Sequence, residues 1–220
     1  SASAISNGIS VFCRLRQWSL LGQKKIRGGN MKVIGIGASA GGLEALTELL
    51  DATPGDTGFS FVIIQHMSRT GPTMLAELLA RHTPMPVHYI DPGEEAQPNT
   101  IYILPPGKNL SIRHGRFRMQ DFDERMQRLN PIDHFLTSLS QDSGSDACAI
   151  ILSGTGSDGT IGIGAIKSQG GIAMAQGKGS AKFAGMPDSA IATGMVDFVL
   201  SPREMPAKLV ELRKFKAKKL

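Results

Sequence analysis

Short apolar runs alternate with amphipathic segments along the chain from Met31 onward. The runs are rich in Val, Ile and Phe and bounded by Gly, Pro or polar residues, a pattern typical of buried β-strands. A further pair of short runs meets at His114-Gly115, which predicts a hairpin over residues 109–119. We expect the other strands at 32–37, 59–66, 87–90, 100–105, 147–154, 171–176 and 196–200.

Segments with helical periodicity lie between these strands. In one of them Leu75, Leu78 and Leu79 fall on one face. The last helix is predicted to begin at "SPRE", with Ser201 as the N-cap and Glu204 three residues further on. We expect helices at 41–50, 71–82, 131–142, 158–170, 186–194 and from 201 toward the end of the chain.

Strands that alternate with helices predict right-handed crossovers and a parallel sheet. The expected fold class is therefore α/β, with three layers: a mostly parallel β-sheet flanked by helices, plus a small antiparallel hairpin. We found neither repeat nor linker, which predicts one folded domain over residues 31–212. We expect a basic, disordered extension at 1–30 and a basic tail at 213–220.

The net charge of +5 comes from the two ends of the chain. Residues 1–30 carry five basic residues and no acid, and residues 213–220 carry five more basic residues. Residues 31–212 hold 14 basic and 19 acidic residues. A nucleic-acid-binding protein would place positive charge on a folded face, so the sequence argues against a nucleic-acid partner.

The chain contains two cysteines, Cys13 and Cys148, too few for a disulfide framework or a cysteine metal site. A reducing compartment, and hence a cytoplasmic location, is the expectation. No apolar stretch approaches 18 residues, so we expect no insertion into a membrane.

The segment 33–46, "VIGIGASAGGLEAL", fits two incompatible templates. One is G-x-G-x-x-A ending at Ala40, the phosphate-binding turn of a dinucleotide fold. The other is G-x-S-x-G centred on Ser39, a turn that exposes a serine nucleophile. A dinucleotide fold also needs an acidic residue at the end of the second strand, where this chain has Gln65 and His66. The nucleotide hypothesis therefore lacks its second support.

The serine hypothesis finds further support on other strands. Neighbouring parallel strands end at the same edge of a sheet, and Ser39 and His66 each stand at or beyond a predicted strand end. The glycine-rich loop "SGTGSDG" leaves another strong strand and carries Asp158. These positions predict a Ser-His-Asp relay in which Ser39 attacks, His66 takes its proton and Asp158 orients the imidazole. The chain order Ser, His, Asp differs from that of the α/β-hydrolases.

Several separated motifs resemble one known family. "GIGASAGGLEAL", "QHM", "IYILPPG", "SGTGSDG" and "FAGMPDSAI" together look like the catalytic domain of the chemotaxis receptor methylesterases, the CheB type, over roughly 32–212. The resemblance implies a parallel α/β fold and hydrolysis of glutamate γ-methyl esters on chemoreceptors, often with deamidation of glutamine. It also implies that Ser39, His66 and Asp158 are catalytic, and that neither metal nor cofactor is needed.

Two features differ from the chemotaxis members of that family. Those members carry a phosphorylatable receiver domain ahead of the catalytic one, and thirty residues are too few to form such a domain. They also usually have methionine in the loop before the catalytic aspartate, where this chain has Thr155. The loop sequences look closer to the variant that is fused to a receptor methyltransferase, which implies a methyltransferase as a possible partner.

Ester hydrolysis also requires donors for a tetrahedral oxyanion. Backbone N–H groups of Ala40 after the serine, or of Thr155 and Gly156 in the second loop, are the candidates. Met186 stands at a predicted loop end and could shape the substrate groove.

Three structural alternatives remain at the level of single residues. Ser39 could cap the helix that follows it, His66 could be a histidine satisfied at a strand end, and Asp158 could cap the helix over 158–170. For the whole chain, a nucleotide-binding module and a catalytically silent interaction domain are the alternative functions.

Overall fold

The computed structural model describes the backbone of residues 33–65, 74–121 and 130–217, and side chains as far as residue 214. The strands are β1 Val33–Ala38, β2 Ser60–Gln65, β3 Val87–Tyr89, β4 Thr100–Ile103, β5 Lys108–Arg113, β6 Arg116–Asp121, β7 Cys148–Ile151, β8 Ile172–Gln176 and β9 Phe198–Leu200. The α-helices are α1 Gly42–Asp51, α2 Leu75–Leu79, α3 Pro131–Ser143, α4 Thr160–Ser168, α5 Gly185–Ala192 and α6 Met205–Ala217. Two 3₁₀ turns follow α2 and α3, at Ala80–His82 and Gly144–Asp146.

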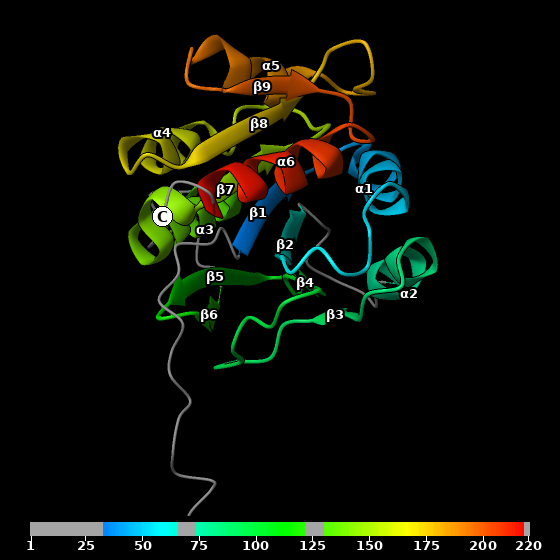
Figure 1. Ribbon diagram of the computed structural model, residues 1–220, viewed down its shortest axis with the longest axis vertical. Helices are drawn as coiled ribbons and strands as arrows, with labels where there is room; N and C mark the ends of the chain where they lie inside the picture. Colours follow the sequence, from blue (N-terminus) through cyan, green and yellow to red (C-terminus); the bar gives the residue numbers. More distant parts are fainter. Residues whose placement is uncertain (1–32, 66–73, 122–129, 218–220) are drawn as a thin grey trace, which may run out of the picture.

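Seven of the strands form one parallel sheet in the order β3-β4-β2-β1-β7-β8-β9 (Figure 1). The strands β5 and β6 form the predicted antiparallel hairpin. Its turn residues His114 and Gly115 both have positive φ, 53° and 71°, as a two-residue hairpin turn requires. The predicted α/β class and the hairpin are confirmed.

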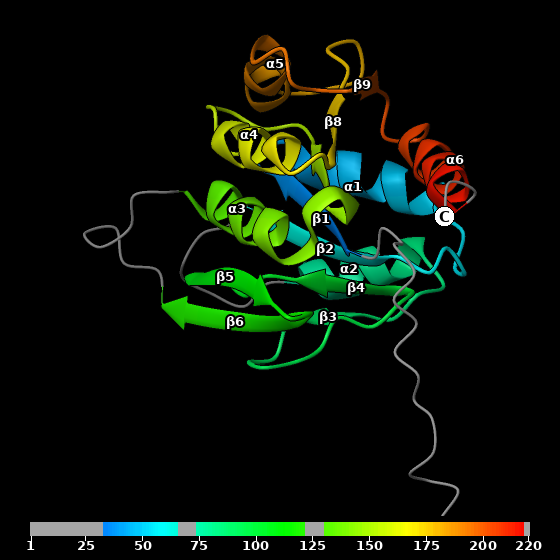
Figure 2. The same cartoon turned by 60° about the vertical axis from the view of Figure 1, so that its left-hand side comes forward.

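Helices cover both faces of the sheet, which gives the three expected layers (Figure 2). On one face α1, α2 and α6 bury their apolar residues against the strands. On the other face α3, α4, α5 and the hairpin do the same. In the described parts of the chain, no helix is both long and apolar enough to cross a bilayer.

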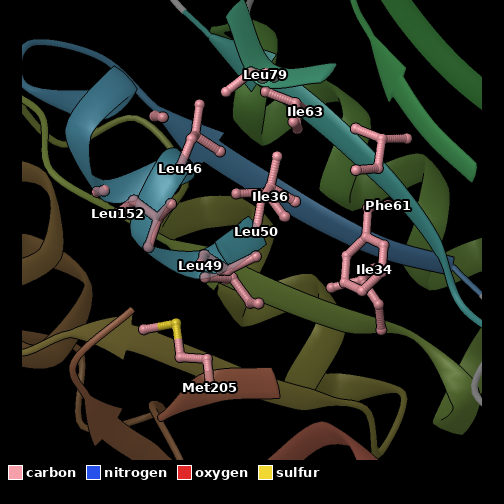
Figure 3. Close-up of a cluster of buried hydrophobic side chains, with 14 of the residues drawn as sticks. Ile34, Ile36, Leu46, Leu49, Leu50, Phe61, Ile63, Leu79, Leu152 and Met205 are labelled. Carbon is pink, nitrogen blue, oxygen red and sulfur yellow. The ribbon is translucent and has the colours of Figure 1, made fainter. Parts of the chain in front are cut away.

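The core on the α1 face is built mostly from aliphatic side chains, with Phe61 and Met205 among them (Figure 3). Ile34 and Ile36 alternate along β1 and meet Leu46 and Leu49 of α1, and all four are fully buried. Met205 at the start of α6 closes the same cluster. The opposite face of β1 carries Gly35 and Gly37 instead of large side chains, and α3 occupies that space.

The last helix begins later than predicted. Residues 202–204 form turns, and α6 starts at Met205. The Glu204 carboxylate accepts hydrogen bonds from the Ser201 N–H (2.9 Å) and the Ser201 hydroxyl (2.6 Å). The predicted pairing of Ser201 with Glu204 is present, but Ser201 is not the N-cap of α6, because a turn at 202–204 lies between Ser201 and the start of the helix at Met205.

Part of the predicted basic tail is helical, since α6 continues to Ala217. Arg213 donates a hydrogen bond to the backbone carbonyl of Thr57 and lies over the ring of Phe59, 5.3 Å from its centre. Through these contacts α6 holds the loop that leads into β2.

At the central strand β1, the side on which the chain adds new strands to the sheet reverses. From β1 the chain builds outward through β2 and β4 on one side, and β7, β8 and β9 extend from β1 on the other side. The helix after β1 covers one face and the helix after β7 covers the opposite face. Ligands of open α/β sheets bind in the crevice at the carboxyl ends of two such strands.

Candidate active site

Ser39 is the first residue beyond β1, at the carboxyl edge of the sheet. Its N–H donates to the carbonyl of Ser153 (3.0 Å), and its carbonyl accepts the N–H of Gly42 (2.9 Å). Gly41 is the N-cap of α1, with φ 69°, and no side chain caps this helix. The alternative in which Ser39 serves as the N-cap is therefore wrong. The hydroxyl of the half-buried Ser39 makes no hydrogen bond with another described residue.

Ser153 ties the turn of Ser39 to a distant loop. Its fully buried hydroxyl donates to the carbonyl of Ala40 (2.8 Å) and accepts the N–H of Phe183 (3.0 Å). Its N–H donates to Oε1 of Gln176 in β8 (2.8 Å). Sequence reasoning missed this role, although Ser153 opens the "SGTGSDG" motif.

Replacing Ser153 with alanine is expected to lower the free energy of unfolding by about 1–3 kcal/mol, because the Phe183 N–H and the Ala40 carbonyl lose the partner that the fully buried hydroxyl provides. Urea denaturation measures the change. Ser168→Ala is the matched control, since the Ser168 hydroxyl is exposed and bonds only within its own helix. Equal stability of both variants and the wild type would contradict the role of Ser153.

The loop after β7 runs directly past the serine. A Cβ atom on Gly154 would lie 2.9 Å from the Ser39 Cβ and 2.4 Å from the Met186 sulfur, so only glycine fits between them. The fully buried Met186 is fixed by its N–H, which donates to the carbonyl of Gly154 (2.9 Å). Met186 therefore packs against the loop at Gly154, which in turn lies against Ser39, the predicted nucleophile.

The backbone around the serine contains N–H groups available to a ligand. Thr155 and Gly156 are exposed, and Ala40 is half-buried. Among the described residues, none accepts a hydrogen bond from the N–H of Ala40, Thr155 or Gly156. Gly156 has φ 84°, and its carbonyl accepts the hydroxyl of Ser189 (3.1 Å), which holds the loop in place.

Asp158 is buried, with only 4% of its surface exposed. One carboxylate oxygen accepts the N–H of Ile132 (3.1 Å) and the other accepts the N–H of Asp133 (2.9 Å). Both donors belong to the first turn of α3. The helix that follows Asp158, α4, has Gly159 as its N-cap and no side-chain cap. Asp158 therefore caps a different helix from the one that the sequence suggested.

The structure brings Ser39 and Asp158 to the same edge of the sheet, since β1 and β7 are adjacent and parallel. Ala38, the last residue of β1, pairs with Gln65, the last residue of β2. His66 follows Gln65 in the chain and lies outside the described residues. Two of the three predicted catalytic positions are thus described.

The structure also argues against a dinucleotide-binding turn after β1. The glycines of β1 serve helix packing: a Cβ at Gly35 would lie 2.6 Å from Leu136, and one at Gly37 would lie 2.7 Å from Ile132. The second strand ends at Gln65, so no acid stands where a ribose would bind.

Known proteins share both the sequence motifs and the architecture of this chain. The family model described as CheB methylesterase matches residues 34–209. The chain belongs to the CheB methylesterase family. The crystal structure of the Thermotoga maritima CheB methylesterase catalytic domain superposes with a TM-score of 0.75 at 32% identity, covering 82% of this chain and 98% of that one.

Curated relatives of this CheB-family chain are longer proteins. A protein-glutamate methylesterase/protein-glutamine glutaminase of Paramagnetospirillum magneticum is 35% identical over 84% of this chain and 52% of the relative. An uncharacterised 104.1 kDa protein of Rhodobacter capsulatus is 46% identical over 57% of this chain and 13% of that protein. The chain spans about half the length of the methylesterase relatives that it matches.

Beside Asp158, this CheB-family chain carries a second buried carboxylate that sequence reasoning missed. Asp133 is 3% exposed, and one of its oxygens accepts the N–H of Gly162 (2.8 Å). Burial raises the pKa of Asp133 to about 6; the Gly162 N–H opposes this shift and the charge of Asp158 adds to it. No sequence motif marks Asp133, because its environment comes from α4.

The raised pKa of Asp133 predicts a pH dependence of stability. Below about pH 4 the carboxyl is protonated in both the folded and the unfolded chain, and it causes no penalty. Between about pH 4 and 6 the unfolded chain ionises this carboxyl while the folded chain keeps it protonated, so stability falls over that range and levels off above about pH 6. Asp133→Asn removes this penalty, and its free energy of unfolding should exceed that of the wild type at pH 8 by up to about 3 kcal/mol.

Chemical denaturation at pH 4 and pH 8 measures this difference. The two proteins should differ less at pH 4 than at pH 8. Asp142→Asn, at the half-buried C-terminal end of the same helix, is the control and should show no such trend. An advantage of Asp133→Asn that is the same at both pH values would contradict the prediction.

Proposed function

We propose that this chain is a protein-glutamate methylesterase that hydrolyses glutamate γ-methyl esters on chemoreceptors, and that it also deamidates glutamine. The observation that carries the proposal is the position of Ser39 in a CheB-family fold. Ser39 lies on the turn beyond the central strand, at the switch point of the sheet, and its hydroxyl is not engaged by the described residues.

In the proposed reaction, the Ser39 oxygen forms a bond to the ester carbonyl carbon, and His66 takes the hydroxyl proton. The tetrahedral intermediate collapses, the C–O bond to the methoxy group breaks, and His66 returns the proton to release methanol. Water then attacks the acyl-enzyme, again with His66 as base, and yields the glutamate side chain and free Ser39. Asp158 holds the imidazole in the required tautomer.

The tetrahedral oxyanion requires fixed donors at the site. We assign this role to backbone N–H groups of Ala40, Thr155 and Gly156, which none of the described residues accepts. Each such donor typically contributes about 3 kcal/mol in the transition state. Met186 supports the site from behind, through its contacts with Gly154.

A protein substrate needs apolar contacts around the reacting group. Leu43, in the first turn of the helix that follows the serine turn, is 37% exposed, and Phe183 is 41% exposed. The Phe183 ring packs 3.0 Å from the Cβ position of Gly41. We propose that these two side chains flank the groove in which the methylated receptor segment lies.

The finer features of the protein are proposed on the same basis. Residues 31–212 form the catalytic domain, and the chain acts in the cytoplasm without inserting into the membrane. The predicted extension at 1–30 lies outside the described residues. The loop sequence with Thr155 before Asp158 resembles the variant fused to a receptor methyltransferase, and on that basis we propose a receptor methyltransferase as a partner. The proposed reaction uses no nucleic acid, metal or cofactor.

Methanol release from methylated chemoreceptor is the experiment that tests the function. The wild-type chain should release methanol, and Ser39 should react with a fluorophosphonate, which labels activated serines. Absence of both reactions would favour the catalytically silent interaction domain instead. Saturable binding of NAD without methanol release would favour the nucleotide-binding module.

A further inference from the structure

Helices α3 and α4 exchange the groups that cap their first turns. Neither helix is capped by the side chain of its own N-cap residue, Asn130 or Gly159. Asp158, just before α4, accepts two N–H groups at the start of α3. Asp133, in the first turn of α3, accepts the N–H of Gly162 in the first turn of α4. We call Asp133 and Asp158 the crossed caps.

Close packing of the two helices holds the crossed caps together. A Cβ atom on Gly162 would lie 2.5 Å from the Leu136 Cβ and 3.3 Å from the Asp133 Cα, so any larger residue would separate α3 from α4. Both carboxylates are nearly excluded from water. In a shielded environment each of these hydrogen bonds is stronger than it would be at the surface, and losing one is more costly.

The loop that carries Asp158 depends on this anchor. Between the end of β7 and the start of α4 the sequence is "LSGTGSDG", and Gly156 and Gly159 both have positive φ. Glycine-rich backbone has access to many conformations, and the Ser189 contact anchors the loop only as far as Gly156, so Asp158 beyond it needs a further anchor. The contact between Asp133 and Gly162 fixes the far end of the loop against α3.

Asp133 also reduces stability at neutral pH, because burial, together with the nearby charge of Asp158, disfavours its ionised form. An asparagine at position 133 would present the same acceptor oxygen without a charge. Titratable groups with a raised pKa that lie beside a specific charged partner are found mostly at functional sites, and Asp133 lies directly against Asp158.

We propose that Asp133 is a positioning residue: by capping α4 it fixes the Asp158 carboxylate in the place from which it acts at the carboxyl edge of the sheet. The inference rests on the proposed methylesterase function and adds the residue that orients Asp158. In this proposal, the side-chain oxygen of residue 133 that accepts the Gly162 N–H is the group that matters. The backbone N–H of residue 133, which binds Asp158, is present in every variant.

The test compares Asp133→Ala and Asp133→Asn in steady-state methanol release from methylated chemoreceptor. Asp133→Ala should lower kcat by about tenfold to a hundredfold, as expected for a displaced catalytic group, with KM unchanged. Asp133→Asn keeps the acceptor and should restore kcat to near the wild-type value. Circular dichroism and the melting temperature establish that each variant is folded at the assay temperature.

Asp142 offers a matched control on the same helix. Its carboxylate also accepts backbone N–H groups of another element, those of His114 and Gly115 in the hairpin turn. Asp142→Ala should therefore reduce stability and leave kcat at the wild-type value. If Asp133→Ala does not fold, Asp133→Glu replaces it; a displaced acceptor should again lower kcat by tenfold or more at constant KM, and a wild-type kcat would overturn the inference.

The outcomes separate the inference from the proposed function. An active wild type with an equally active, folded Asp133→Ala variant would overturn the inference alone. An Asp133→Asn variant as slow as Asp133→Ala would also overturn it, since the acceptor oxygen would not be what matters. A wild type that releases no methanol and does not react with fluorophosphonate would overturn the proposed function, and the inference with it.

Discussion

Replacing Ser39 with alanine is expected to abolish methanol release. The hydroxyl is the proposed nucleophile, and removing the nucleophile of a serine hydrolase relay costs about 10⁶-fold in kcat. The fold should not change, because the hydroxyl bonds no other described residue and the turn is held by the backbone of Ser39. Methanol release and the melting temperature, measured on the same preparation, check both statements.

Ser168→Ala is the control for the loss of a hydroxyl, since Ser168 lies on the exposed part of α4. It should match the wild type in both measurements. Methanol release by Ser39→Ala at the wild-type rate would remove Ser39 as the nucleophile. Loss of activity together with a large fall in the melting temperature would instead show that Ser39 is structural.

Most of the fold could be predicted from the sequence, because local signals agree with the tertiary structure. Buried parallel strands read as continuous apolar runs, and each run of this kind became a strand of the parallel sheet. The hairpin turn at His114-Gly115 carries its own backbone preference. The start of the last helix was predicted too early, because residues 202–204 form turns although their sequence is typical of a first helical turn.

The glycines of β1 show what local patterns leave open. In sequence, Gly35 and Gly37 fit a phosphate-binding turn, whereas in the structure they make room for Leu136 and Ile132 of α3. The contact joins segments about a hundred residues apart. No local pattern contains that information, so the sequence supported two templates for one loop.

The candidate site could also be predicted only in part. Ser39 and Asp158 could be placed at strand ends from the order of the elements, and the structure puts both at the carboxyl edge. The partners of Asp158 could not be predicted, because its donors lie in α3 and a local rule assigns it to α4. Ser153 and Asp133 were missed because only tertiary contacts distinguish them from other buried polar residues.

Asp158→Asn tests the role of the third catalytic residue and is expected to lower kcat by about 10⁴-fold, as the loss of the orienting carboxylate does in serine proteases. Stability should fall as well. Each carboxylate oxygen accepts one N–H from α3, and an asparagine has a single acceptor oxygen, so one buried N–H loses its partner at a cost of about 1–3 kcal/mol. The assay is therefore run well below the melting temperature of the variant.

The two effects of Asp158→Asn can be separated with Asp142→Asn. In Asp142 too, each carboxylate oxygen accepts a backbone N–H at a helix–hairpin contact, but at the far end of α3. The control should lose stability and keep kcat, because the lost hydrogen bond is remote from Ser39. If Asp158→Asn lost stability and kept the wild-type kcat, Asp158 would be a helix cap without a catalytic role. The capping geometry alone accounts for a loss of stability. It cannot produce a 10⁴-fold loss of turnover in a folded protein.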